Sequence, residues 1–311
     1  MTNRRTKAYI YLLLVVLIWG LAGPVIKFTL EGIDPLPFIS YRLAISAVIS
    51  IFFFLGKIKR GKKFRQLNAH LPLALLYGFL AVPLGLGLLF VALDNTTVLD
   101  LTLIGVIGPL IVTAGGSLFF HERITKREKI GIGIVLVGVL LNSLFPILKS
   151  EGIRLTANIL LLMYLIADAG SVLVAKKLSR YKINSANLTN LAFILGAVIL
   201  IPVTIFSYGL NGFIDQIITL PLKYHLGVWY MAVLSGSIAY YMFVRAYKSI
   251  EVSEAVLFNY LQPVVTIPLA VFWLKESLSW HFILGAVFIV IGLFIAERKR
   301  KVKKMTDLKH V

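Results

Sequence analysis

The chain has 311 residues, of which 59% are hydrophobic and 15% are charged, and its mean hydropathy is +0.88. Soluble domains average about 45–50% apolar and about 25% charged residues, so this composition excludes an ordinary soluble protein. The net charge of +18 does not indicate nucleic-acid binding, because the basic residues follow a membrane topology, and the absence of cysteine excludes disulfides and CxxC redox pairs.

Apolar runs recur along the whole chain, and a helix needs roughly 20 apolar residues to cross a bilayer core. The N-terminal run is too long for a signal peptide and is predicted to be the first span. The fold class is therefore an all-α polytopic membrane protein with ten transmembrane helices. The predicted spans lie near residues 8–30, 35–56, 71–93, 97–119, 127–148, 155–176, 186–208, 224–247, 253–274 and 280–297.

Orientation follows from the lysines and arginines. Ten spans place both termini on one side, and most of the 32 basic residues fall there, with clusters at 57–65, 123–129 and 298–311. Cytoplasmic loops carry such an excess of Lys and Arg. A multi-pass protein of the cell (plasma) membrane with cytoplasmic N- and C-termini is therefore expected.

An internal repeat appears when the chain is shifted by 154 residues. The repeated residues are prolines, glutamates and glycines, which have special backbone or charge roles. Each half holds five spans, and an odd number means that the second half enters the membrane inverted. We expect two five-helix inverted-topology repeats over 8–148 and 155–297, then a basic tail over 298–311. The matching pairs are Pro109 with Pro263, Glu122 with Glu276, Gly131 with Gly285, and Gly138 with Gly292.

The repeated glutamates, Glu122 and Glu276, each follow bulky apolar residues at the end of a predicted span. As structural corners, their carboxylates would accept backbone N–H groups at the positive end of a helix. A gate or a proton site is the alternative. Their position near the water interface, where ionisation costs little, favours the structural role.

The doubled Pro–Glu–Gly–Gly pattern is accompanied by Trp19–Gly20 in the first span and by Arg42 followed by small residues in the second. As a set, these features resemble the EamA-type members of the drug/metabolite transporter superfamily over about residues 8–297. The resemblance implies a ten-span inverted-repeat transporter with a central cavity. Such transporters carry substrates from amino acids and amines to sugars and nucleotide-linked metabolites, and many export them.

Helix breaks mark corresponding places in the two halves. Pro83 lies in VPLGLG of the third span and falls on Ser237 of the eighth, while Pro109 and Pro263 interrupt the fourth and ninth. A proline removes a backbone donor and bends a helix, which frees a carbonyl beside a wet cavity. Both a hinge at the substrate site and a plain packing kink are consistent with these prolines.

Asp168 is the most informative single residue, because it lies about a dozen residues from either end of the sixth span. A carboxylate at that depth costs about 2.5–3.5 kcal/mol to insert, so it is expected to face the protein interior or a water cavity. We interpret it as a counter-ion for a substrate amine or as a proton-coupling group. The alternative is a buried acid satisfied by a neighbour, and Tyr164, one turn away, is placed to donate to it.

Weaker candidates complete the predicted site. Asn259 and Gln262 are one turn apart and share a helix face, and Trp19 could stack on a ligand. Of the adjacent Tyr240 and Tyr241, which point in different directions, Tyr241 is taken as the cavity residue together with Ser237. Lys27 and Arg42 are expected toward the outer mouth, either to attract an anion or to snorkel.

The sequence predicts a secondary transporter that exports a small metabolite such as an amino acid or an amine. It contains no GxxxxGK[ST], so ATP is not the direct driver and a proton gradient is the candidate energy source. A membrane scaffold or sensor, or a membrane-embedded enzyme, is the alternative. The expected partners are a small-molecule substrate and the lipid bilayer, with no cofactor, metal or nucleic acid, in a monomer or a homodimer.

Overall fold

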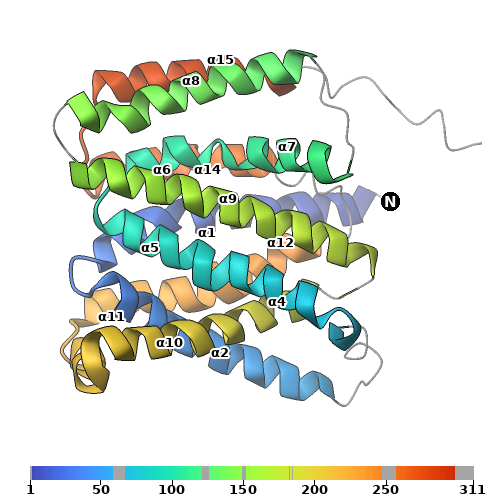
Figure 1. Cartoon of the computed structure of the whole chain (residues 1–311), viewed down its shortest axis with the longest axis vertical. Helices are drawn as coiled ribbons and strands as arrows, with labels where there is room; N and C mark the ends of the chain where they lie inside the picture. The colour runs from blue at the N-terminus through green and yellow to red at the C-terminus, as the bar shows by residue number, and fades with distance from the viewer. Residues whose placement is uncertain are drawn as a thin grey trace, which may run out of the picture.

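The computed structural model describes residues 2–58, 67–120, 126–148, 152–181, 183, 185–246 and 257–297. Within these ranges the chain is helical and has no strand (Figure 1). The elements are α1 (Thr2–Thr29), α2 (Pro35–Ile58), α4 (Leu71–Phe79), η1 (Leu80–Leu86), α5 (Gly87–Asp94), α6 (Val98–Gly105), α7 (Gly108–Phe120), α8 (Lys126–Leu148), α9 (Gly152–Arg180), α10 (Ser185–Ile218), α11 (Leu222–Trp229), η2 (Tyr230–Ala239), α12 (Tyr240–Ala246), η3 (Leu257–Leu261), α14 (Gln262–Phe272) and α15 (Trp280–Glu297).

Seven of the described helical segments are long and apolar enough to cross a membrane. Three shorter apolar helices lie where the fifth, ninth and tenth spans were predicted: Lys129–Leu141, Phe258–Phe272 and Trp280–Ile295. The protein is thus an all-helical, multi-pass membrane protein. The third and eighth predicted spans are each built from three consecutive segments, α4–η1–α5 and α11–η2–α12.

Helices from the two halves of the chain pack against each other in matching pairs. α2 lies along α10, and α8 lies along α15 at the edge of the bundle (Figure 1). α1 contacts α14 and the α11–η2–α12 span, while α9 contacts α6, α7 and the α4–η1–α5 span. These contacts therefore occur in pairs that are related by exchanging the two halves.

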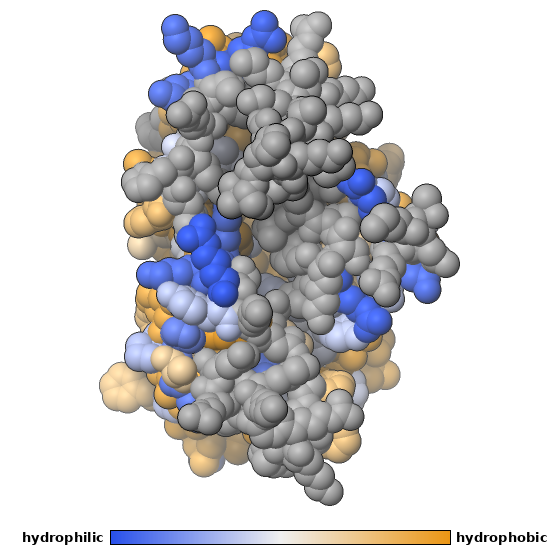
Figure 2. Space-filling model, turned by 90° about the vertical axis from the view of Figure 1, so that its right-hand side faces the viewer, coloured by the Kyte–Doolittle hydropathy of each residue, from blue (hydrophilic) through white to orange (hydrophobic). Residues whose placement is uncertain are grey.

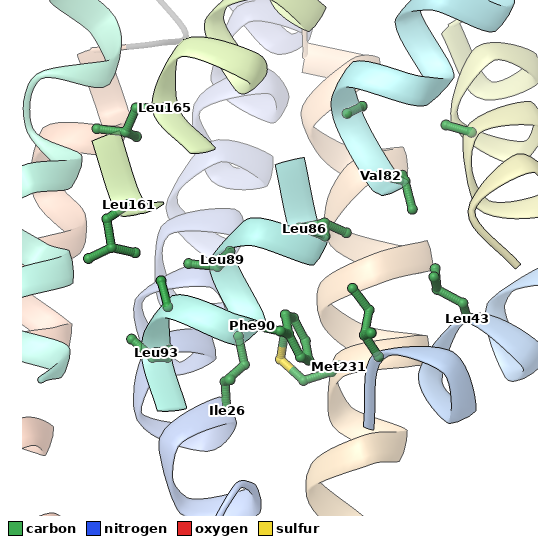
Figure 3. Packing of buried hydrophobic residues seen from close by; sticks show 14 of the residues in the cluster. Ile26, Leu43, Val82, Leu86, Leu89, Phe90, Leu93, Leu161, Leu165 and Met231 are labelled. Carbon is green, nitrogen blue, oxygen red and sulfur yellow. The ribbon is translucent and has the colours of Figure 1, made fainter. Parts of the chain in front are cut away.

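A single large apolar cluster fills the interior between these helices. It draws buried side chains from both halves, including Phe90 and Met231, which lie next to each other in Figure 3. By contrast, many large apolar side chains on the outside are exposed, with Phe206 at 92% and Phe52 at 75%. Apolar surface of this kind suits contact with lipid rather than water.

The repeated glycines lie at the crossing of α8 and α15. A Cβ atom at Gly138 would lie 2.7 Å from the carbonyl oxygen of Gly285, and a Cβ at Gly292 would lie 2.7 Å from that of Gly131. The two contacts are the same contact with the halves exchanged. Small residues let helix backbones approach closely in membranes, so this crossing explains why the four glycines recur.

The end of the bundle at which α1 begins carries polar residues (Figure 2). Gly209, with φ of +71°, interrupts α10 at the end of the predicted seventh span. Figure 2 shows the end at which α1 begins, where hydrophilic residues gather while apolar residues occupy the margins. Basic side chains such as Lys126, Lys177 and Arg180 lie on the helix ends that reach this side.

Candidate functional site

Asp168 lies on the interior face of α9. The buried Leu165 and Leu161 lie one and two turns before it on that face, whereas Met163 and Ile166 point outward and are 48% and 62% exposed. Asp168 as a whole residue is partly buried within the bundle. Among the described residues the carboxylate has neither a hydrogen-bond donor nor an ionic partner, and a buried acid satisfied by a neighbouring lysine is not what the structure shows.

Three tyrosine hydroxyls lie within electrostatic reach of Asp168. They come from separate elements: Tyr77 from α4, Tyr164 from α9 itself, and Tyr240 from α12. The hydroxyl of Tyr77 is also hydrogen-bonded to the side chain of Thr189 on α10. Both halves of the chain therefore contribute polar groups to one mid-membrane cluster around a carboxylate.

Trp19 connects α1 to this cluster. Its indole N–H donates to the carbonyl of Ser235 at 3.1 Å, and its ring meets that of Tyr240 edge-on at 5.2 Å between centroids. Phe243 packs on the same indole at 4.8 Å. Trp19 therefore forms part of the aromatic wall next to Tyr240, with its polar atom already bound to the η2 backbone.

Arg42 lies inside the helix bundle, a position that the sequence did not indicate. The side chain is only 1% exposed, so it does not snorkel to the outer interface as one expectation held. Nε and Nη1 are buried and have no hydrogen-bond partner among the described residues. The guanidinium carbon lies 5.4 Å from the ring centre of Phe90. Such a cation–π contact contributes about 0.5–2 kcal/mol, less than the several kcal/mol that burying an unpaired charge costs.

The two halves place a π-helix at equivalent positions of their third spans. η1 covers Leu80–Leu86 and η2 covers Tyr230–Ala239, and a shift by 154 residues superimposes most of η1 on η2. Pro83 is buried within η1, and the hydroxyl of Ser237 in η2 donates to the carbonyl of Ala232 at 3.2 Å. π-Helical turns inside α-helices occur often at functional sites, and these two flank Asp168 and Tyr240.

Helix restarts also coincide in the two halves. α7 begins at Gly108 and α14 begins at Gln262, which are 154 residues apart, and Pro109 and Pro263 each occupy the first turn of the new helix. Proline fits there because the first-turn N–H groups have no intrahelical acceptor. These prolines therefore stand where the fourth and ninth spans change direction or helix type.

Asn259 and Gln262 share a face, as their spacing indicates, but they bind each other. The amide N–H of Gln262 donates to the Asn259 side-chain oxygen at 3.1 Å. One turn further on, Thr266 donates to the carbonyl of Gly20 at 2.8 Å and thereby ties α14 to α1. The amide pair therefore lies beside α1, and no contact of it with Asp168 is present in the described part of the chain.

Tyr240, rather than Tyr241, is the tyrosine that faces the cluster. The ring of Tyr241 is 50% exposed, and its hydroxyl accepts a hydrogen bond from Arg245 at the end of α12. The choice of Tyr241 from the sequence is therefore corrected to Tyr240. Because the two adjacent tyrosines point in different directions, the sequence indicated that one of them faces inward. It could not show which one, because η2 changes the direction of the side chains that follow it.

Glu276 connects the loop after α14 to the start of α6. Its two carboxylate oxygens accept the backbone N–H groups of Val98 at 2.7 Å and Leu99 at 2.9 Å. The hydroxyl of Thr97 accepts the N–H of Asp100 at 3.0 Å and so caps the start of α6. The first three free N–H groups of α6 are therefore all satisfied. The equivalent Glu122 lies outside the described residues.

The same corner binds the two halves together through Asp100. Arg154 of α9 pairs with its carboxylate at 2.8 Å, and Asn158 donates to it at 3.3 Å. Lys27 is also at this end of the bundle, where its ammonium donates to the carbonyls of Leu93 and Asp94 at 2.9 Å each. Lys27 and Asp100 therefore have structural partners and lie apart from the Asp168 cluster.

Removing the Glu276 carboxylate should destabilise the start of α6. In Glu276→Ala, two N–H groups of α6 lose their acceptor, so we expect the free energy of unfolding to fall by about 1–2 kcal/mol. The measurement is thermal unfolding of the purified protein in detergent. Glu31→Gln, an exposed acid on the same side, is the matched control and should change stability little. Equal stability of Glu276→Ala and wild type would contradict the capping role.

Glu276 also predicts a pH dependence. Burial raises the pKa of Glu276 above its ordinary value of 4.5, although the N–H groups of Val98 and Leu99 and the charge of Lys27 oppose the shift. A carboxyl with a raised folded-state pKa adds stability below pH 4.5 that is lost as the pH rises through the raised value. The stability of wild type relative to Glu276→Gln should therefore decrease as the pH rises above about 4.5. The same dependence of stability on pH in the two proteins would contradict this prediction.

Comparison with known proteins places this architecture in a family. The EamA-like transporter family matches the chain twice, over residues 6–144 and 155–297. The chain is 24% identical to the uncharacterized transporter YcxC of Bacillus subtilis over 94% of its length and 93% of the relative. It is 27% identical to a protein of Salmonella typhimurium named probable amino-acid metabolite efflux pump, over 91% and 92% of the two chains.

One solved crystal structure shares the fold. It aligns with a TM-score of 0.62 over 94% of this chain and 97% of its own, at 14% sequence identity. The relatives are named as transporters or efflux pumps, which points to a transporter rather than an enzyme. Because the family covers both halves of the sequence, the chain belongs to the EamA-like transporter family.

Proposed function

We propose that the protein is a secondary transporter that exports a small metabolite, such as an amino acid or an amine, by alternating access. The observation that carries this proposal is Asp168, a carboxylate at mid-span on an interior face, without an ionic partner among the described residues. An intramembrane carboxylate on an interior face is suited to bind a substrate ammonium or a proton. Export is supported by relatives in Salmonella typhimurium and Escherichia coli that are named as amino-acid metabolite efflux pumps.

The proposed architecture is ten spans in two inverted five-helix repeats, over 8–148 and 155–297. Three observations support it. The helix contacts recur with the halves exchanged, the π-helices and helix restarts occur at positions 154 residues apart, and the family matches the two ranges separately. In such transporters one repeat moves against the other around a fixed site near the bilayer midplane.

Energy coupling and orientation complete the proposal. The end of the bundle at which α1 begins carries basic helix ends, which supports cytoplasmic termini in the cell membrane under the positive-inside rule. A proton is the proposed coupling ion and Asp168 the proposed carrier. The groups that face it are the hydroxyls of Tyr77, Tyr164 and Tyr240, and these hydroxyls can donate to the carboxylate while it is ionised.

Counterflow into proteoliposomes tests the function. Vesicles containing the purified protein are loaded with an unlabelled amino acid or amine, and uptake of a trace of the labelled compound is followed. We expect saturable uptake of at least one compound, which exits unchanged. Absence of saturable uptake across the panel would favour a scaffold or sensor, and chemical conversion of the compound would favour an enzyme.

Tyr240 and Tyr241 provide a matched pair of substitutions. Tyr240→Phe removes a hydroxyl that interacts with Asp168, so we expect the transport rate to fall about 3–10-fold, equivalent to one hydrogen bond of about 1 kcal/mol. Tyr241→Phe removes a hydroxyl at the exposed end of the helix and should leave the rate unchanged. A larger loss in Tyr241→Phe than in Tyr240→Phe would overturn the corrected assignment.

A further inference from the structure

Arg42 is a buried cation of α2 whose Nε and Nη1 have no acceptor in the described part of the chain. Its head group is enclosed by aromatic and small residues: the ring of Phe90 on one side, and Gly236 on the other, where a Cβ atom would lie 3.6 Å from Nη2. The same Cβ would lie 3.5 Å from the ring of Phe193. The rings of Phe90 and Phe193 offer no oxygen acceptor, and Nε and Nη1 of Arg42 are buried without a hydrogen-bond partner among the described residues.

Tyr240 is close enough to both Arg42 and Asp168 to feel their charges. It interacts electrostatically with both of them, whereas the two charged groups form no ion pair with each other in the described part of the chain. A carboxylate and a guanidinium near one tyrosine, each without an ionic partner among the described residues, offer complementary charges to a molecule that carries both. The negative group of such a molecule could pair with the Arg42 guanidinium, and its positive group could pair with the Asp168 carboxylate.

We infer that Arg42 binds the carboxylate group of the transported molecule while Asp168 binds its ammonium group, so that the substrate is a zwitterion with both charges. This inference rests on the proposed transport function. A guanidinium is suited to the task because its planar fork binds a carboxylate through two parallel hydrogen bonds. Arg42 comes from α2 and Asp168 from α9, so one bound molecule contacts both halves of the chain. In the described state Arg42 is closed off from solvent, and the carboxylate reaches it as the halves move.

The experiment uses pairs of compounds that differ only in the carboxylate. The pairs are L-alanine and ethylamine, L-leucine and isoamylamine, L-phenylalanine and phenethylamine, and L-lysine and cadaverine. Counterflow of each compound is measured for wild type, Arg42→Gln and Arg42→Lys. For the pair that wild type carries best, Arg42→Gln should lose at least about 30-fold in amino-acid flux and keep the flux of the amine, while Arg42→Lys recovers part of the loss.

Thermal unfolding without substrate separates binding from a structural role. Because no hydrogen bond to Nε or Nη1 is lost, Arg42→Gln should be at least as stable as wild type. A lower melting temperature would mean that the arginine supports the fold and would overturn the assignment. Stabilisation of wild type, but not of Arg42→Gln, by chloride or acetate alone, with unchanged amino-acid flux in the variant, would assign the site to a free anion instead.

The outcomes distinguish failure of the Arg42 assignment from failure of the proposed transport function. Equal amino-acid flux in Arg42→Gln and wild type, or flux of amines alone in wild type, would overturn the carboxylate site and leave a working transporter. Failure of wild type to carry any compound of the panel would overturn both.

Discussion

Replacing Asp168 with asparagine is expected to lower the transport rate at least about 30-fold and to remove its pH dependence. Asparagine keeps the size of the side chain but neither pairs with an ammonium nor releases a proton in the working range. The loss of one buried charge partner corresponds to about 2 kcal/mol or more. The rate and its pH profile are measured by counterflow in proteoliposomes.

Stability should move differently from transport in this variant. Asp168 has no ionic partner among the described residues, so Asp168→Asn breaks no ion pair and removes a charge that is costly at mid-membrane. Its melting temperature should therefore equal or exceed that of wild type. Asp215→Asn, at an exposed position near the end of α10, is the matched control for transport. Unchanged transport and an unchanged pH profile in Asp168→Asn would remove Asp168 from the site.

Enlarging Gly138 should separate α8 from α15. A Cβ at this position would lie 2.7 Å from the carbonyl oxygen of Gly285 and 2.9 Å from the Cβ of Phe288, distances that an ordinary side chain does not tolerate. Overpacking of this kind costs about 1–3 kcal/mol, and backbone contact leaves little room for relief. We expect Gly138→Leu to lower the melting temperature of the purified protein clearly below that of wild type.

The chain offers a control on the same helix. A Cβ at Gly133 would meet nothing within 4 Å, so Gly133→Leu adds the same side chain to α8 without the contact and should leave stability nearly unchanged. Gly292→Leu should reproduce the loss, because Gly292 meets the Gly131 carbonyl in the exchanged contact. The two losses should not add in the double variant, since both act on one crossing. Equal melting temperatures for the Gly138 and Gly133 variants would mean that the crossing is not close-packed.

Local patterns in the sequence were sufficient for most of the helices. The predicted span over 280–297 coincides with α15, and those over 35–56 and 127–148 agree with α2 and α8 within two residues. Apolar length and the turn signals between the runs determine these limits, and both are local properties. The cap of α6 by Thr97 was likewise predictable, because it depends on residues three apart.

Contacts between distant segments were not predictable from these patterns. Glu276 was expected to cap a helix, and the helix that it caps is α6, 178 residues away from it at Val98. The burial of Arg42 depends on Phe90 and Gly236, which belong to other spans, so its sequence neighbours gave no sign of it. The π-helices shift the direction of the side chains that follow, and for this reason the sequence pointed to Tyr241 and not to Tyr240.

Sided labelling of a single cysteine tests the central claim most directly. The chain has no cysteine, so Tyr164→Cys introduces a unique thiol on the face of α9 that holds Asp168. Right-side-out and inverted vesicles are treated with a membrane-impermeant thiol reagent, with and without a transported amino acid. Alternating access predicts labelling from both sides, with substrate changing the two rates in a coupled way. Labelling from one side only, or from neither, would contradict a mid-membrane site that each side reaches in turn.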